Sequence, residues 1–223
     1  MPAPKAQKNF TDPESRIMLD GATKGFVQAF NAQIAVDAES QIIVAAEVTQ
    51  DAVDTRQLVP VLLAVEKNVG RLPDVATADN GYFNPEAITD ERLAGVDLYV
   101  ATARERKPSQ PVGDSTPTPI AAASSPAQPC APVTVVQQMR DKLATEAGRA
   151  IYKRRKCIPE PVFGQIKEAR GFRRFSFRGL AKVTAEWTVV ALTHNLLKLF
   201  RSGWKVAAMS PSVGRVEKAM RGS

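Results

Sequence analysis

The chain has 223 residues, of which 44% are apolar, and it carries a formal net charge of +7 at pH 7. This length suffices for one domain with a sizeable core plus extensions, and the basic balance favours a nucleic acid or another anionic partner. The two cysteines, Cys130 and Cys157, lie far apart without a CxxC pattern, and His194 is the single histidine. A structural zinc site is therefore not expected.

No segment of the sequence predicts membrane insertion. The N-terminal stretch MPAPKAQKNFTDPE has no apolar core and does not read as a signal peptide. The apolar stretch 181–200 is interrupted by Lys182, Glu186 and Lys198, which is typical of an amphipathic helix rather than a membrane span. We therefore expect a cytoplasmic protein without a membrane partner.

The first half of the chain predicts strands and helices in alternation. Residues 1–24 are expected to be irregular. The segment FVQAFNAQIAVD and the segment from Ile42 predict a β-hairpin, with Asp37 as a turn residue. A helix is expected over residues 55–70, because proline is tolerated near its start and Gly70 is a natural stop.

The segment VATAD, residues 75–79, predicts a short strand that ends in a carboxylate. Asn84 is suited to cap a helix that begins at Pro85, and residues 96–102 predict another strand. A hairpin followed by helix, strand, helix and strand predicts an α/β fold with part of its sheet parallel.

The composition changes after residue 103. Residues 104–135 are rich in Pro, Ser, Ala and Thr and carry almost no charge, which predicts a disordered linker. Helices are then expected over residues 135–155, 161–170 and 180–200, and a frayed tail over 203–223. We expect residues 25–103 and 136–202 to be two parts of one domain.

Two carboxylates stand out by their positions. Asp79 ends a predicted strand, where α/β sheets usually hold their chemistry, and it could equally cap the turn that follows at Asn80 and Gly81. Glu160 falls in the first turn of a predicted helix, where an acid also simply complements the helix dipole. Taken singly, each residue is a weak signal.

The surroundings of Glu160 favour a binding role. Glu160 and Lys167 are seven residues apart and would share one face of a regular helix, with Gly164 leaving that face open. The segment 149–182 contains about eleven Lys and Arg residues but only two acids. Aromatic residues are interleaved with these cations, namely Tyr152, Phe163, Phe172, Phe175 and Phe177. This excess predicts contacts with a phosphate backbone, although some of the arginines could instead cover a solvated helix surface.

Asp79 and Glu160 are also of the residue types that bind divalent metal ions. Phosphodiester chemistry with two metal ions about 4 Å apart needs typically three convergent acids to offset the repulsion between the ions. Asp79 and Glu160 would supply two of them.

Three blocks of this sequence resemble a known family. "DPESRIM…GFVQAFNAQIAVD", "VATADNGYFNPEAI" and "EPVFGQIKEARGFRRFSFRGLAKVTAEW…HNLLKL" are similar to the DDE transposases of bacterial insertion sequences, in the IS1182-like group of the IS4/IS5-like assemblage. The blocks occur in the family's order and cover the chain from about residue 12 to residue 200, apart from the linker.

The resemblance implies a ribonuclease-H-like fold, with a mixed sheet flanked by helices, of which this chain lacks the first strand. It implies that Asp79 and Glu160 are catalytic ligands of Mg²⁺, with Mn²⁺ as an alternative, and that Lys167 contacts phosphate beside the scissile bond. The first catalytic Asp of the family has no match here, and Asp20 lies in an expected loop. The DNA-binding residues implied by the matching block are Tyr152, Arg155, Lys156, Lys167, Arg170, Arg173, Arg174 and Arg178.

The function expected from the resemblance is that of a transposase fragment. The parent activity is metal-dependent cleavage at transposon ends followed by strand transfer, and we expect the chain alone to be inactive because it has two of the three acids. Its partners would be DNA and either a second copy or a full-length transposase. The sequence leaves open a non-catalytic DNA-binding or regulatory protein, and also a decaying gene remnant without function.

Overall fold

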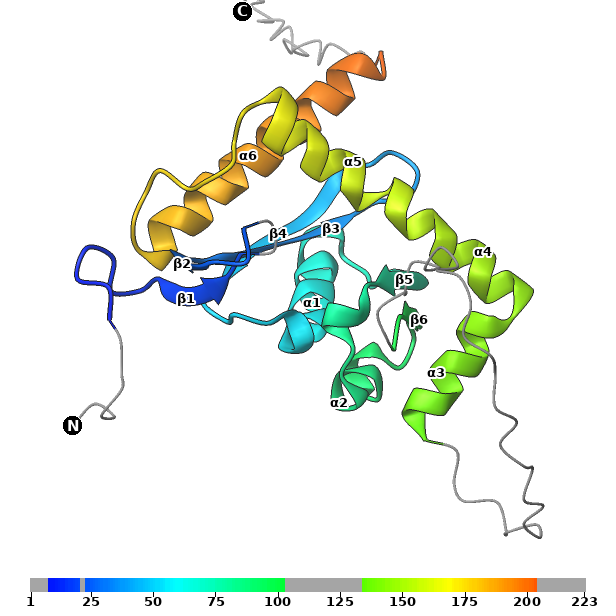
Figure 1. The fold of residues 1–223 in the computed structure, drawn as a ribbon. Helices are drawn as coiled ribbons and strands as arrows, with labels where there is room; N and C mark the ends of the chain where they lie inside the picture. The colour runs from blue at the N-terminus through cyan, green and yellow to red at the C-terminus, as the bar shows by residue number, and fades with distance from the viewer. Residues whose placement is uncertain (1–7, 21–22, 103–133, 204–223) are drawn as a thin grey trace, which may run out of the picture.

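The computed structural model describes residues 8–20, 23–102 and 134–203, so most of the predicted linker and tail lies outside the described residues. The architecture is mixed α/β (Figure 1). The strands form three two-stranded sheets. These are β1 (Arg16–Leu19) with β2 (Phe26–Ala29), β3 (Asn31–Val36) with β4 (Ile43–Thr49), and β5 (Val75–Ala78) with β6 (Asp97–Val100).

The sheets partly match the sequence prediction. The hairpin of β3 and β4 is antiparallel, and β5 pairs with β6 in parallel, both as expected. The predicted first strand is divided at Phe30, and its first half pairs instead with β1, inside the segment that was expected to be irregular. The continuous ribonuclease-H-like sheet that the resemblance implied is not formed among the described residues, where each sheet has two strands.

Helices connect and cover these strands. A 3₁₀ turn, η1 (Asp54–Arg56), precedes α1 (Leu58–Val69), and η2 (Asn80–Tyr82), α2 (Pro85–Ile88) and η3 (Glu91–Leu93) join β5 to β6. The C-terminal part consists of helices, which are α3 (Val135–Ala144), α4 (Glu146–Arg154), the 3₁₀ turn η4 (Arg155–Cys157), α5 (Pro159–Gly164), the π-helix η5 (Gln165–Ala169) and α6 (Leu180–Arg201). None of the helices in the described ranges could span a membrane.

Local chemistry explains where several helices begin and end. Helix α1 stops at Gly70, whose φ of 84° suits a residue without a β-carbon. The Asn84 side chain accepts a hydrogen bond from the Glu86 amide at 3.0 Å, and Pro85 begins α2. Both features confirm the sequence prediction.

The long helix predicted over residues 135–155 is two helices. Thr145 is extended, with ψ of 156°, and its hydroxyl accepts a hydrogen bond from the Gly148 amide at 2.9 Å. The threonine therefore ends α3 and caps α4. A β-carbon at Gly148 would collide with the carbonyl oxygen of Lys142, so the tight junction needs glycine at this position.

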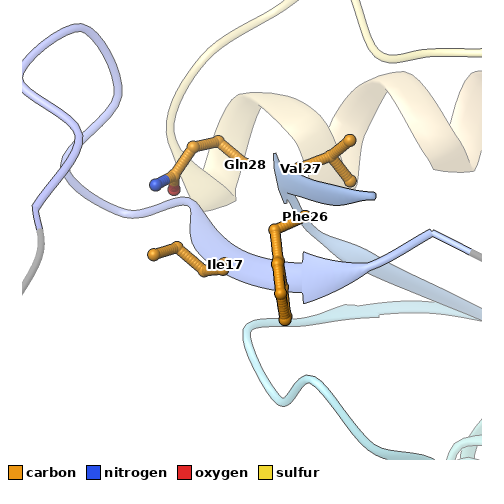
Figure 2. Close-up of a pocket in the computed structure, with 4 residues that line it drawn as sticks. All are labelled: Ile17, Phe26, Val27 and Gln28. Atoms are coloured by element: carbon orange, nitrogen blue, oxygen red, sulfur yellow. The ribbon is translucent and has the colours of Figure 1, made fainter. Parts of the chain in front are cut away.

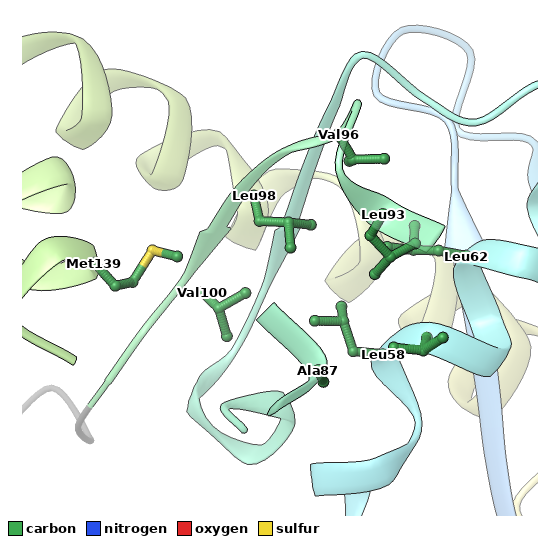
Figure 3. Close-up of a cluster of buried hydrophobic side chains, with 9 residues drawn as sticks. Leu58, Leu62, Ala87, Leu93, Val96, Leu98, Val100 and Met139 are labelled. Carbon is green, nitrogen blue, oxygen red and sulfur yellow. The ribbon is translucent and has the colours of Figure 1, made fainter. Parts of the chain in front are cut away.

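Two apolar clusters form the core. The first joins α1 to the parallel strands and the short helices around them (Figure 3), and its buried members are Leu58, Val59, Leu62, Ala87, Leu93, Val96, Leu98, Val100 and Met139. The second joins the β3–β4 hairpin to α5, η5 and α6. At its centre Trp187 is 3% exposed and contacts the rings of Phe172 and Phe175 at centroid distances of 6.2 and 6.1 Å.

Polar side chains fasten α6 to the hairpin. The Asn195 amide accepts from the Ile43 N–H and donates to the Ile43 carbonyl, both at 2.8 Å. The Trp187 indole donates to the Gln33 carbonyl at 3.1 Å, and the His194 ring nitrogen Nε2 lies 3.0 Å from the Gln41 carbonyl. Helix α6 covers these backbone groups of the hairpin and excludes water from them. The side-chain contacts supply the hydrogen-bond partners that water can no longer provide.

Replacing Asn195 by Leu should destabilise the protein. The substitution leaves the N–H and C=O of Ile43 without their partners, and each unsatisfied group costs about 1–3 kcal/mol. The free energy of unfolding, measured by urea denaturation, should fall by at least about 2 kcal/mol. The matched control is Leu196→Ala, because Leu196 is its exposed neighbour and should change stability by about 0.5 kcal/mol or less. Equal losses in the two variants would contradict this role of Asn195.

His194 makes stability depend on pH. Burial, with help from the nearby charges of Arg170 and Lys198, lowers the pKa of His194 below its usual 6.5, although the hydrogen bond to Gln41 opposes the shift. The unfolded chain takes up a proton near pH 6.5 and the folded chain does not, so the free energy of unfolding should fall as the pH drops through this value. An NMR titration of this single imidazole in the folded protein should give a midpoint below 6.5. A midpoint at or above 6.5 would refute the assignment.

Candidate functional site

Asp79 lies where the sequence placed it, directly after β5, and it caps the following turn. Its carboxylate accepts a hydrogen bond from the Gly81 amide at 2.9 Å. The capping role that the sequence left open is therefore realised. It does not exclude a further role, because a carboxylate oxygen can accept more than one hydrogen bond.

A second carboxylate, Asp54, lies beside Asp79. A β-carbon built on Gly81 would be 3.0 Å from Oδ1 of Asp79 and 3.4 Å from Oδ2 of Asp54, so the two acids flank the same point. Sequence reasoning missed Asp54, which precedes α1 by four residues and looks like an ordinary helix-start acid. Its one available signal was its place in a loop between a strand and a helix.

Amide side chains of β3 hold Asp54 in place. Asn31 and Gln33 each donate to Oδ1 of Asp54 at 2.7 Å, and Gln33 also donates to Oδ1 of Asn31 at 2.8 Å. The Tyr82 hydroxyl donates to the Gln33 side-chain oxygen. Burial, and then the charges of Asp54 and Asp79, raise the pKa of Tyr82. The network therefore ties β3 to η2 and keeps a protonated phenol beside two carboxylates.

Glu160 is exposed in the first turn of α5, and it does not complete a group of three acids with Asp54 and Asp79. Within residues 8–20, 23–102 and 134–203, no three His, Cys, Asp or Glu side chains gather closely enough to hold a metal ion. The described carboxylates therefore do not fit a two-metal site. The other acids weighed from the sequence are turn residues, since Asp20 accepts from the Thr23 amide at 3.1 Å and Asp37 from the Ser40 amide at 2.7 Å.

The helix that carries Glu160 and Lys167 is not regular. It changes from α to π at Gln165, and the Arg170 amide bonds to the carbonyl five residues earlier, at 3.2 Å. Because a π turn takes more residues than an α turn, a spacing of seven no longer corresponds to two turns. Lys167 leans toward Phe163, with Nζ 5.4 Å from the ring centroid. The surface at Gly164 is open, as predicted, since an added β-carbon there would meet nothing within 4 Å.

Two of the predicted DNA-binding arginines have partners within the protein. The Arg170 guanidinium donates to the Thr193 hydroxyl at 2.8 Å and to the Thr193 carbonyl at 3.0 Å, which binds η5 to α6. Arg173 forms an exposed ion pair with Glu168. The Arg155 guanidinium lies 5.4 Å from the centroid of the Tyr152 ring. Arg155 begins the turn η4, which separates Tyr152 in α4 from the helix of Glu160.

The remaining predicted cations point outward. Lys156, Lys167, Arg174 and Arg178 are exposed, and so are Lys153, Arg154 and Lys182, which belong to the same basic stretch. These seven cations are therefore accessible from solvent.

A shallow hollow lies on the β1–β2 hairpin. It is lined by Ile17, Phe26, Val27 and Gln28 (Figure 2). No lining residue is ionisable, so the hollow offers no acid or base.

Capping by Asp79 predicts how its variants will behave. Asp79→Ala should lower the free energy of unfolding by about 1 kcal/mol, whereas Asp79→Asn should stay close to the wild type, because Asn caps as well as Asp. The pKa of the Tyr82 phenol should fall in both variants, because both remove a nearby negative charge. Urea denaturation and ultraviolet titration measure the two effects. Equal stability of the Ala and Asn variants would contradict the capping role.

The comparisons with known proteins bear on the C-terminal part. No curated protein and no solved structure matches this chain significantly. Residues 131–200 match the model of a family described as the transposase DDE domain. The match begins just before α3 and ends within α6, so it contains Glu160, Lys167 and the exposed cations, whereas Asp54 and Asp79 precede it. The C-terminal helices of this chain are thus similar to a transposase DDE domain.

Proposed function

We propose that this protein is a transposase-derived DNA-binding protein of the insertion-sequence DDE type. The observation that carries the proposal is that the exposed cations of residues 153–182 all lie inside the segment that matches a transposase DDE domain. The domain points to DNA as the partner, and the outward-facing charges provide the means of binding it.

The proposed contacts are with the phosphate backbone. Arg and Lys side chains that face solvent gain affinity by releasing counterions from DNA, without reading its sequence. Among the predicted residues, we assign this role to Lys156, Lys167, Arg174 and Arg178, with Tyr152 and Arg155 beside them. The contacts of Arg170 with α6 favour a structural role for that residue, and Arg173 would first have to leave Glu168.

The proposal includes a ribonuclease-H-like relation between the sheets. Helix α1 lies against β3 and β4 and also contributes Leu58 and Leu62 to the cluster that holds Leu98 and Val100 of β6. One helix thus covers strands of both sheets, as expected if β3–β4 and β5–β6 are halves of a single layer.

We further propose that the chain binds DNA without cutting it. DDE transposases generally use divalent metals, and the family resemblance assigns Asp79 and Glu160 as Mg²⁺ or Mn²⁺ ligands and Lys167 as the phosphate contact. The described residues bring Asp79 together with Asp54 but assemble no group of three acids. In the proposed non-catalytic or regulatory role, the protein occupies transposon ends or acts beside a complete transposase.

DNA binding should weaken with salt, and it should depend on the exposed arginines. The double variant Arg174→Gln/Arg178→Gln should bind a labelled duplex more weakly, and the slope of log affinity against log salt should become about two units shallower. Fluorescence anisotropy over a salt series measures both. The matched control is Arg71→Gln/Arg92→Gln, which removes two exposed arginines outside the matched segment and should leave the slope unchanged. Equal slopes for all three proteins would argue against this interface.

Purified protein should leave supercoiled and terminal-repeat DNA intact in the presence of Mg²⁺ or Mn²⁺. Gel electrophoresis detects nicking and joining. Nicking that is abolished by both Asp79→Ala and Glu160→Gln would overturn the non-catalytic part of the proposal and show that a complete site assembles. Binding by Glu160→Gln at the wild-type affinity would support it.

A further inference from the structure

The loop between η5 and α6 presents one aromatic ring to solvent. Phe172 and Phe175 turn inward and pack on Trp187, whereas the side chain of Phe177 is 58% exposed. In Figure 1 this loop runs along the outside of the molecule, from the end of the α5 region to the start of α6. A single exposed aromatic residue needs no explanation by itself, so its surroundings decide its meaning.

The backbone under Phe177 is held rigidly. The Glu186 carboxylate, one and a half turns into α6, accepts from the Ser176 amide with both oxygens at 3.0 Å and from the Phe177 amide at 3.1 Å. The far end of the loop is fixed as well, because Asp12 accepts from the Gly179 amide at 3.2 Å and Glu14 from the Leu180 amide at 3.0 Å. The backbone that carries the exposed ring is therefore preorganised, and a partner would not have to order the loop.

Cations flank the ring in the sequence. Arg178 follows Phe177 directly and Arg174 lies three residues before it, and both side chains are exposed. A rigid aromatic ring between two arginines is the combination that binds single-stranded nucleic acid, in which a base stacks on the ring and the cations contact the adjacent phosphates. Bases inside an intact duplex are stacked on each other and do not offer a free face.

We propose that Phe177 is a stacking site for an unpaired DNA base, with Arg174 and Arg178 at the neighbouring phosphates and Glu186 as a positioning residue. The inference rests on the proposed DNA-binding function and deepens it, since it names single-stranded or frayed DNA, rather than closed duplex, as the preferred ligand of this loop.

Affinity for single-stranded DNA tests the stacking directly. Phe177→Ala should weaken binding of a labelled single-stranded oligonucleotide by about 5- to 150-fold, which corresponds to the loss of one stacked base. It should change binding of the same sequence as a blunt duplex by less than about twofold. Phe177→Tyr should retain wild-type affinity, because it keeps the ring. The matched control is Phe200→Ala, which removes another exposed phenyl ring, at the end of α6, and should leave both affinities unchanged.

A base analogue gives an independent readout. The fluorescence of 2-aminopurine in the single strand should be quenched by the wild type and by Phe177→Tyr but not by Phe177→Ala. Equal losses on single strand and duplex, or no loss on either, would overturn the stacking site while leaving the phosphate interface intact. Absence of salt-dependent DNA binding by the wild type would instead refute the proposed function itself.

The variant Glu186→Ala distinguishes a role of Glu186 in positioning the Phe177 loop from a purely electrostatic effect of its charge on DNA. Removing an acid near DNA should leave duplex affinity unchanged or raise it, whereas release of the loop should lower single-strand affinity and weaken 2-aminopurine quenching. The thermal transition of the variant shows that it remains folded. A rise in affinity for both ligands would contradict the positioning role.

Discussion

The attachment of α6 to the β3–β4 hairpin is the constraint on which most of this structure depends. Residues 33–43 and 187–198 are far apart in the sequence, and polar side chains of one helix bond directly to the backbone of the hairpin. Because these bonds are directional, they determine the position of the helix along the strands, which apolar packing alone would leave free. The contacts of Phe172 and Phe175 with Trp187 then fix the loop between η5 and α6 relative to the same helix, and Arg170 fixes the π-helix.

Local patterns predicted much of the fold. The hairpin turn, the end of α1 at Gly70, the capped start of α2 and the length of α6 each depend on residues close in sequence, so composition and spacing were sufficient. The split of the first strand at Phe30 and the pairing of its first half with Arg16–Leu19 depend on a choice of partner, which an alternating pattern does not encode. The break at Thr145 was missed because threonine is compatible with a helix interior, and the decisive close approach of Gly148 to Lys142 is visible only in three dimensions.

The candidate site was predicted in part. Asp79 lies at the end of its strand, as the pattern indicated, but its neighbour is Asp54, and that pairing is created by η1 and η2 meeting across the chain. In the sequence, Asn31 and Gln33 look like ordinary polar strand residues. Only the structure shows that their side-chain amides donate hydrogen bonds to Asp54. Similarly, a run of arginines looks uniform in the sequence. The structure shows that Arg170 binds the protein to itself, whereas Arg174 and Arg178 face solvent, so net charge alone overstates the number of cations available to a polyanion.

The π-helix over Gln165–Ala169 bears on how this segment tolerates change in length. A π turn contains one residue more than the α-helix needs, so a single deletion there would let the helix continue regularly. The wide turn absorbs that extra residue, so the positions on either side of such a deletion would keep nearly their present orientation around the axis. Arg170 would stay opposite Thr193, and Phe172 and Phe175 would stay on Trp187. A deletion in the regular turns of α5 has no such turn to absorb it and would rotate every later position by about 100°.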